Sequence, residues 1–146
     1  MRKQIAVLGF ALCSVFLAPC SPAEAQQAGK IFRIGLLDMS TASGMATLVD
    51  AFRQELNNQG WIEGKNITID YRFTDGKIDR LPGLAKDLVS RKADLIVVTG
   101  TVSALAAKKA TTTIPIVMTS VSDPVAAGLV SNLATPGGNG PRDSIA

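Results

Sequence analysis

The sequence predicts an α/β fold, a parallel sheet with helices on both faces. Short apolar runs of strand length alternate four times with segments whose apolar residues recur at helical spacing. Apolar residues make up 47% of the 146 residues and charged residues 18%, which is typical of a folded globular chain. No internal repeat or Ser/Gly-rich linker interrupts the alternation. Strands joined through helices pair in parallel with right-handed crossovers, so a layered sheet is expected.

The first predicted elements are a strand, a helix and a second strand. Residues 31–37 form a short apolar run that ends at Asp38. Residues 45–56 carry apolar side chains at helical spacing, and Gly60 is expected to end this helix. In residues 66–73 apolar and polar side chains alternate, which indicates a half-buried strand near a sheet edge.

The middle of the chain repeats this pattern twice. Residues 79–89 are predicted to form a helix, with Pro82 in its first turn. Residues 94–98 are apolar after the first position, as expected for a strand buried on both faces. Residues 101–110 form an alanine-rich helical segment, and residues 114–118 are predicted to be the fourth strand.

The end of the chain is predicted to add one helix and then a tail. Asp123 and Pro124 are expected to open a helix that continues through Leu133. A fifth strand is expected to follow in such a fold. Residues 140–146 are instead polar and rich in turn-forming residues, so a disordered tail is expected there.

Residues 1–25 have the pattern of a secretory signal peptide. Arg2 and Lys3 are followed by an apolar run over residues 5–18, and a small-x-small cleavage site ends at Ala25. The apolar run is shorter than the ~20 residues that a membrane-spanning helix needs. We therefore expect cleavage after Ala25 and a periplasmic protein.

Two alternatives remain for this segment. Cys20 could be the lipidated residue of a lipoprotein, although Pro19 directly before it fits such a site poorly. The segment could also be a buried N-terminal helix.

Composition excludes several kinds of site. The chain has no histidine, and both of its cysteines, Cys13 and Cys20, would leave with the signal peptide. A Ser-His-Asp or Cys-His catalytic pair, a disulfide framework and a His/Cys metal site are therefore not expected. No metal or other cofactor is predicted. The net charge of +3 comes from dispersed basic residues, which gives no sign of nucleic-acid binding.

Three loops at the carboxyl ends of predicted strands are the candidate ligand site, because ligands of open parallel sheets bind there. These loops are residues 38–44, 99–103 and 119–123, and each leads hydroxyl side chains into a helix N-terminus. Backbone N–H groups and the helix dipole favour an anion at such a position. The alternative is that these residues only cap their helices. Three such loops at one edge favour a binding cleft.

An enzymatic alternative also exists. Asp38 and Asp123 could serve as acid and base in a small exported α/β hydrolase, although Asp123 before Pro124 is more simply a helix cap. Residues 99–101 lack the G-x-G-x-x-G spacing of a dinucleotide site, and residues 136–140 lack the Lys-Ser/Thr of a P-loop. A third possibility is a structural or signalling lobe that docks on a membrane partner without a ligand.

A set of ordered motifs over residues 33–139 resembles the ABC transporter substrate-binding protein family that includes tryptophan- and tyrosine-binding members. The motifs are residues 51–56 (AFRQEL), 60–67 (GWIEGKNI), 71–72 (YR), 79–82 (DRLP), 104–108 (ALAAK), 113–118 (TIPIVM), 123–125 (DPV) and 136–139 (PGGN). The resemblance implies a type I periplasmic-binding-protein-like fold of two lobes, of which residues 26–139 would be the first. It implies no catalysis and no cofactor.

The resemblance also implies a ligand and a partner. The ligand would be amino-acid-like and possibly aromatic, and an ABC permease at the inner membrane would receive it. The implied ligand-binding residues are Ser40, Thr41, Thr99, Gly100, Thr101, Ser120 and Asp123. The family continues into a hinge strand and a second lobe after the position of Asn139, where this sequence departs from it. A truncated copy with weak or no binding is therefore expected.

Overall fold

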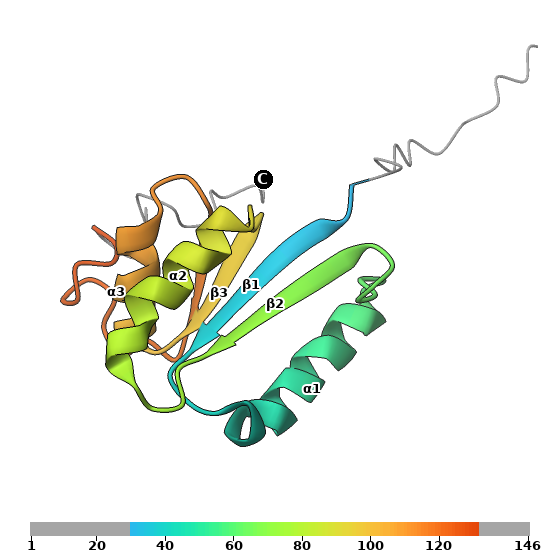
Figure 1. Cartoon of the computed structure of the whole chain (residues 1–146), viewed down its shortest axis with the longest axis horizontal. Coiled ribbons are helices and arrows are strands. Elements are labelled where there is room, and N and C mark those ends of the chain that lie inside the picture. The colour runs from blue at the N-terminus through green and yellow to red at the C-terminus, as the bar shows by residue number, and fades with distance from the viewer. Residues whose placement is uncertain (1–29, 132–146) are drawn as a thin grey trace, which may run out of the picture.

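The computed structural model of the chain describes residues 30–131 (Figure 1). The predicted signal peptide, its cleavage site and Cys20 lie outside the described residues. So do the end of the predicted last helix and the predicted tail at residues 140–146.

The described residues form a parallel sheet of four strands in the order β2-β1-β3-β4. The registers pair Phe32 of β1 with Ile67 of β2, Ile34 with Leu95 of β3, and Ile96 with Ile116 of β4. The strands are β1 (Phe32–Asp38), β2 (Ile67–Phe73), β3 (Leu95–Thr99) and β4 (Ile116–Thr119). The alternating strand is an edge strand, as predicted, and the uniformly apolar one lies inside the sheet.

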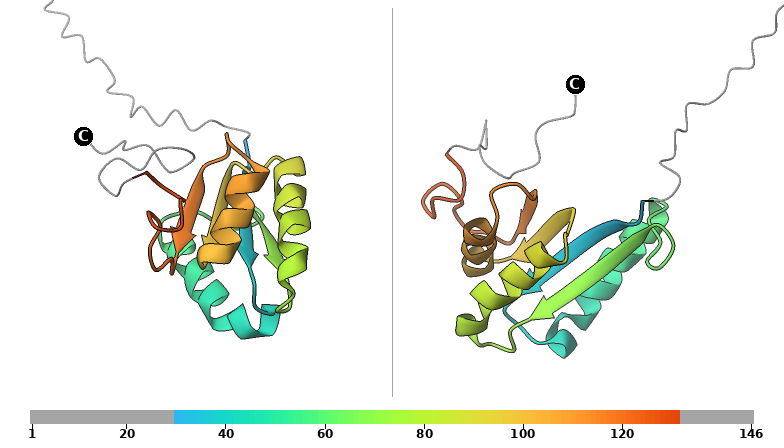
Figure 2. Two further views of the ribbon diagram at one scale, coloured as in Figure 1. Left: turned by 90° about the vertical axis from the view of Figure 1, so that its left-hand side faces the viewer. Right: turned by 45° about the horizontal axis from the view of Figure 1, so that its top comes forward.

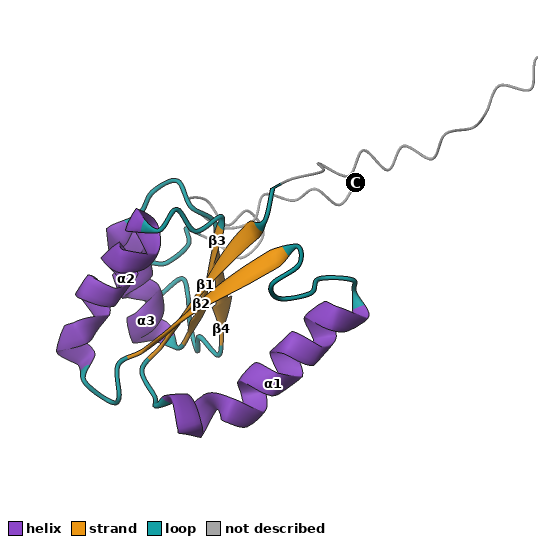
Figure 3. Ribbon diagram, turned by 45° about the vertical axis from the view of Figure 1, so that its right-hand side comes forward, coloured by secondary structure: helices purple, strands orange, loops and turns teal. Residues whose placement is uncertain are grey.

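Helices cover both faces of this sheet, which confirms the predicted fold class. One face carries α1 (Ala42–Asn58), and the other carries α2 (Leu81–Ser90) and α3 (Thr101–Ala110) (Figures 1 and 3). A short 3-10 helix, η1 (Ile78–Arg80), leads into α2. No helix within residues 30–131 is long and apolar enough to cross a membrane.

The prediction of a last helix from Asp123 through Leu133 is wrong over the described residues. The chain makes one turn, which ends at Gly128 in a left-handed conformation (φ 67°). Leu129 N donates to Pro124 O (2.8 Å) and Gly128 N to Val125 O (2.9 Å). This is the bond pattern of a Schellman motif, which terminates a helix. The glycine therefore stops the helix after its first turn.

Lys108 of α3 holds this turn in place. Its ammonium group donates to the carbonyl oxygens of Gly128 (2.6 Å) and Leu129 (3.0 Å). Leu129 is buried in the core beneath α2 and α3. Figure 2 shows the segment after β4, in red, beside α3. The lysine is thus a structural contact as well as part of a solvated helix face.

The main core lies between the sheet and the pair α2 and α3. Leu37 of β1, Leu88 of α2 and Ile96 of β3 are fully buried there. Gly35 lets α2 approach β1 closely, because a Cβ at this position would lie 2.9 Å from the methyl carbons of Leu88. Such close packing of α2 against β1 is typical of a protein interior.

A smaller apolar cluster lies beneath α1. It is built on Ile34, Leu36, Ile67 and Ile69, and partly buried side chains of α1 pack against it. No residue of α1 itself is fully buried. The α1 face is therefore more loosely covered than the face beneath α2 and α3.

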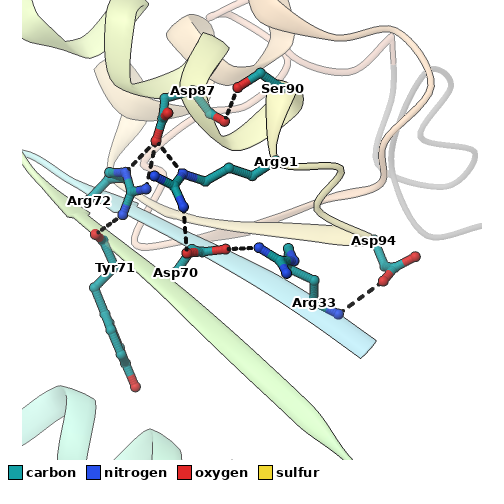
Figure 4. A network of polar contacts seen from close by, with 8 residues as sticks. All are labelled: Arg33, Asp70, Tyr71, Arg72, Asp87, Ser90, Arg91 and Asp94. Carbon is teal, nitrogen blue, oxygen red and sulfur yellow. Dashed lines mark hydrogen bonds and ion pairs between the residues drawn. The ribbon is translucent and has the colours of Figure 1, made fainter. Parts of the chain in front are cut away.

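The polar half of β2 takes part in an ion-pair network on the α2 side (Figure 4). Asp70 lies 3.1 Å from the guanidinium of Arg33 and 3.8 Å from that of Arg91. Asp87 of α2 lies 2.6 Å from Arg72 and 3.0 Å from Arg91. Charged side chains on an edge strand also disfavour pairing with another chain.

Candidate functional site

The candidate site lies at the carboxyl edge of the sheet, where the chain changes direction. After β1 the chain crosses through α1 to β2 on one side, and α2 then returns it to β3 on the other side. Such a switch point opens a crevice between the loops of the two central strands. Ser40 and Thr41 follow β1, and Gly100 and Thr101 follow β3, so these residues flank the switch point.

In the loop after β1, the polar side chains form hydrogen bonds with neighbouring residues of the same segment. Asp38 is 5% exposed, and its carboxylate accepts hydrogen bonds from the Ser40 amide (2.7 Å) and from the Ser40 hydroxyl. Thr41 caps α1, because its hydroxyl oxygen accepts from the Gly44 amide (3.0 Å). At Thr41 the capping interpretation therefore holds.

The loop after β2 fixes this loop from the side, which was not predicted from the sequence. Thr74 is fully buried, and its hydroxyl donates to the carbonyl oxygen of Met39 (2.8 Å). The amides of Asp75 and Gly76 donate to the carbonyl oxygens of Ser40 (3.1 Å) and Met39 (2.7 Å). The turn-forming run after the alternating strand was the available signal, but its partner, the loop after β1, lies far away in the sequence.

The loop after β3 differs from the loop after β1. Gly100 occupies the N-cap position of α3 with φ 81° and ψ 159°, and no side chain of residues 30–131 caps this helix. That backbone conformation is open essentially only to glycine. The Gly100 amide donates to Thr119 O (2.9 Å), and the Thr119 hydroxyl donates to the Thr99 hydroxyl (3.3 Å). The ends of β3 and β4 are thereby held together, while the α3 N-terminus has no side-chain cap.

The loop after β4 contains an exposed serine and an exposed aspartate. Ser120 has a left-handed backbone (φ 54°). Asp123 uses one carboxylate oxygen, Oδ1, to accept from the amides of Val125 (3.1 Å) and Ala126 (2.8 Å). Asp123 thus caps the single turn that follows it, as its position before proline indicates. Both carboxylates of the alternative acid–base pair, Asp38 and Asp123, are engaged by backbone groups of their own loops.

Neither of two cavities described next to α1 involves the predicted site residues. One has a volume of about 120 Å³ and is bounded by Leu56, Trp61 and Ile69 among others. The second has a volume of about 460 Å³ and lies between α1 and β2. Within residues 30–131, no group of three or more His, Cys, Asp or Glu side chains is placed to hold a metal ion.

Comparison with known proteins places this arrangement in a family. A model of the family described as "ABC transporter substrate binding protein" matches residues 33–140. A curated relative, the "Tyrosine-binding protein" of Clostridioides difficile (strain R20291), is 40% identical over 106 residues, which cover 73% of this chain and 31% of the relative. The chain thus spans about a third of the length of this relative.

Solved structures give the same result. A ligand-free, open substrate-binding protein with adhesive properties from Clostridium difficile has a TM-score of 0.69 and 38% identity, over 75% of this chain and 37% of the other. An ABC domain from Streptococcus pneumonia in complex with L-Trp has a TM-score of 0.67 and 28% identity, over 74% and 36%. A periplasmic binding protein from Burkholderia mallei shares the fold alone (TM-score 0.53, 18% identity, over 64% and 28%).

Proposed function

This chain belongs to the ABC transporter substrate-binding protein family, and on that premise we propose that its carboxyl edge forms one wall of a site for an aromatic amino acid. The relatives support the ligand class, since one is named for tyrosine and another was solved with L-Trp. The family is one of binding proteins rather than enzymes.

The observation that carries the proposal is the uncapped N-terminus of α3. Thr41 caps α1 and Asp123 caps the turn after β4, whereas Gly100 offers no side chain to the first amides of α3. Free amides and the positive end of a helix dipole attract a carboxylate. The Gly100 amide donates to Thr119, so we assign the ligand carboxylate to the position beside Gly100, where it would accept from the Thr101 amide and the amides that follow it.

The ligand's ammonium group would lie toward the loop after β4. Asp123 uses Oδ1 for both of its capping bonds, which leaves Oδ2 as a charged acceptor at an exposed position. Ser120, Ser40 and Thr99 supply hydroxyl groups along the same edge. Opposite charges at α3 and at Asp123 would match the two charges of an amino acid.

The wider role follows the family. We propose that the protein is exported by a signal peptide cleaved after Ala25 and works in the periplasm. There it would deliver its ligand to the permease of an ABC importer. Fractionation and amino-terminal sequencing of the mature protein test the export step, and cross-linking to the permease tests the partner.

A Thr101→Asp variant tests the carboxylate site. A negative charge in the first turn favours the helix itself by about 0.3–1 kcal/mol, so the fold should persist. The same charge repels the ligand carboxylate, so binding of L-tryptophan should be lost. Thr101→Asn is the neutral control and should retain binding.

The measurement is an NMR titration of the full chain with L-tryptophan and L-tyrosine. The NMR resonances of residues 99–103 and 120–123 are expected to shift in the unaltered chain and in Thr101→Asn. An unchanged response in Thr101→Asp would contradict the assignment, as would an absence of shifts at this edge up to the solubility limit of L-tryptophan.

A further inference from the structure

The larger cavity beside α1 has the size of a ligand site. Its volume of about 460 Å³ falls in the range of roughly 300–1,000 Å³ that is usual for small-molecule pockets. The apolar lining comes from Ala42, Ala46 and Val49 of α1 and from Tyr71 and Phe73 of β2. We call this cavity the α1–β2 groove.

The charges around the groove do not cancel. Arg53 and Asp50 of α1 complete its lining. The guanidinium of Arg53 is paired with Glu63 at 2.8 Å. The Asp50 carboxylate forms no ion pair or hydrogen bond with another side chain or backbone group of residues 30–131. One cation and two carboxylates therefore leave a net charge of about −1, carried by an exposed Asp50.

Tyr71 adds a polar group to an otherwise apolar wall. Its hydroxyl oxygen is buried and interacts with the side chain of Glu63. The ring stacks on Phe73, with centroids 6.4 Å apart and planes 11° apart. Figure 4 shows the Tyr71 ring pointing away from the ion-pair network, on the other side of β2. Burial, followed by the charge of Glu63, raises the pKa of Tyr71 to about 12, so the phenol stays neutral.

We propose that the α1–β2 groove binds a small amine with an aromatic or aliphatic body. The apolar body lies against the alanines and Val49. The ammonium group pairs with Asp50 and faces the electron-rich rings of Tyr71 and Phe73, which attract a cation.

This site is separate from the amino-acid site at the carboxyl edge. None of the seven predicted ligand-binding residues lines the groove. The carboxyl edge offers helix amides to an anion, whereas the groove has a surplus carboxylate. Asp50 and Glu63 would repel a carboxylate, so the groove selects a cation, whereas the carboxyl edge matches both charges of an amino acid.

The test is an NMR titration of the full chain with 2-phenylethylamine, compared with 3-phenylpropionate, which has a body of similar size and the opposite charge. Binding of the amine should shift resonances of Ala46, Val49 and Phe73, and the carboxylate should leave them unchanged. Asp50→Asn should weaken amine binding about tenfold, which corresponds to the loss of one charge contact. Ala46→Phe should abolish it by filling the groove.

Glu55→Gln is the matched control, since Glu55 lies on the same helix and bonds to Asn58 and Gln59 instead. It should bind the amine as the unaltered chain does. Failure of the amine to shift the groove residues would overturn the proposal. Equal binding of the carboxylate, shifts confined to residues 99–103, or unchanged affinity in Asp50→Asn would do the same. If a variant does not fold, the comparison of the amine with the carboxylate in the unaltered chain still tests the proposal.

Discussion

At the scale of single residues, the predicted ligand residues differ in whether they cap a helix or turn. Thr41 and Asp123 were both predicted as ligand residues, and each uses a side-chain oxygen to cap its own turn. Gly100 has no such oxygen. The part of the proposed site most open to a ligand is thus the position that has no side chain.

Gly100→Ala should destabilise the protein. A Cβ is disfavoured at φ 81° and ψ 159°, and such strain costs roughly 1–3 kcal/mol. Gly83→Ala is the matched control, because Gly83 lies inside α2 with open space around it and alanine is the better helix former. It should stabilise the protein by about 0.5–1 kcal/mol. Urea unfolding measures both free energies, and equal midpoints would contradict the strain at Gly100.

Asp87 should make the protein sensitive to acid. Hydrogen bonding from Arg72 is the chief reason that the pKa of Asp87 lies below its ordinary value of 3.8. A carboxyl group whose pKa is lower in the folded state stabilises the fold above its unfolded pKa. This stabilisation is lost as the pH falls below about 3.8 toward the folded value. Urea midpoints should therefore drop over that window, and less steeply in Asp87→Asn. Identical pH profiles of the two proteins would refute this role.

At the scale of elements, the three helices are held unequally. Each of α2 and α3 has three buried residues, whereas α1 has none. The long α1 is held mainly by partly buried side chains such as Phe52 and Leu56. A helix with few buried contacts opens at a lower free energy than one in the core.

Native-state hydrogen exchange should show this difference. Amides in the middle of α1 are expected to exchange faster than those of α2, although α1 is the longer helix. Amine binding in the α1–β2 groove should slow the exchange of α1 and leave α3 unchanged. Protection of α1 equal to that of α2 would show that the apolar cluster beneath it is tighter than its burial indicates.

At the scale of the whole molecule, the described residues contain only one wall of the proposed ligand site. In binding proteins that close around their ligand, a second surface buries the bound molecule. One wall leaves much of an amino acid in water. The carboxyl edge alone is therefore expected to bind L-tryptophan with a Kd of about 1 mM or weaker, equivalent to no more than about 4 kcal/mol.

Calorimetric titration of the full chain checks this expectation. The Clostridioides difficile relative, of which this chain spans about a third, is the positive control for the assay, with L-tyrosine as its ligand. A micromolar Kd for this chain would contradict the expectation and would mean that one wall is sufficient.

The sequence alone determined the strand–helix alternation, the parallel sheet and the edge position of β2, because periodicity reflects which face of each element is buried. It also indicated the Asp123 cap, which is a local contact. It did not predict that Gly128 would stop the last helix, since one glycine in an apolar helical pattern is ambiguous. Only the tertiary structure showed that the Thr74 hydroxyl bonds to the loop after β1 and that a groove lies between α1 and β2. These features depend on how segments distant in the sequence pack together, which local periodicity does not specify.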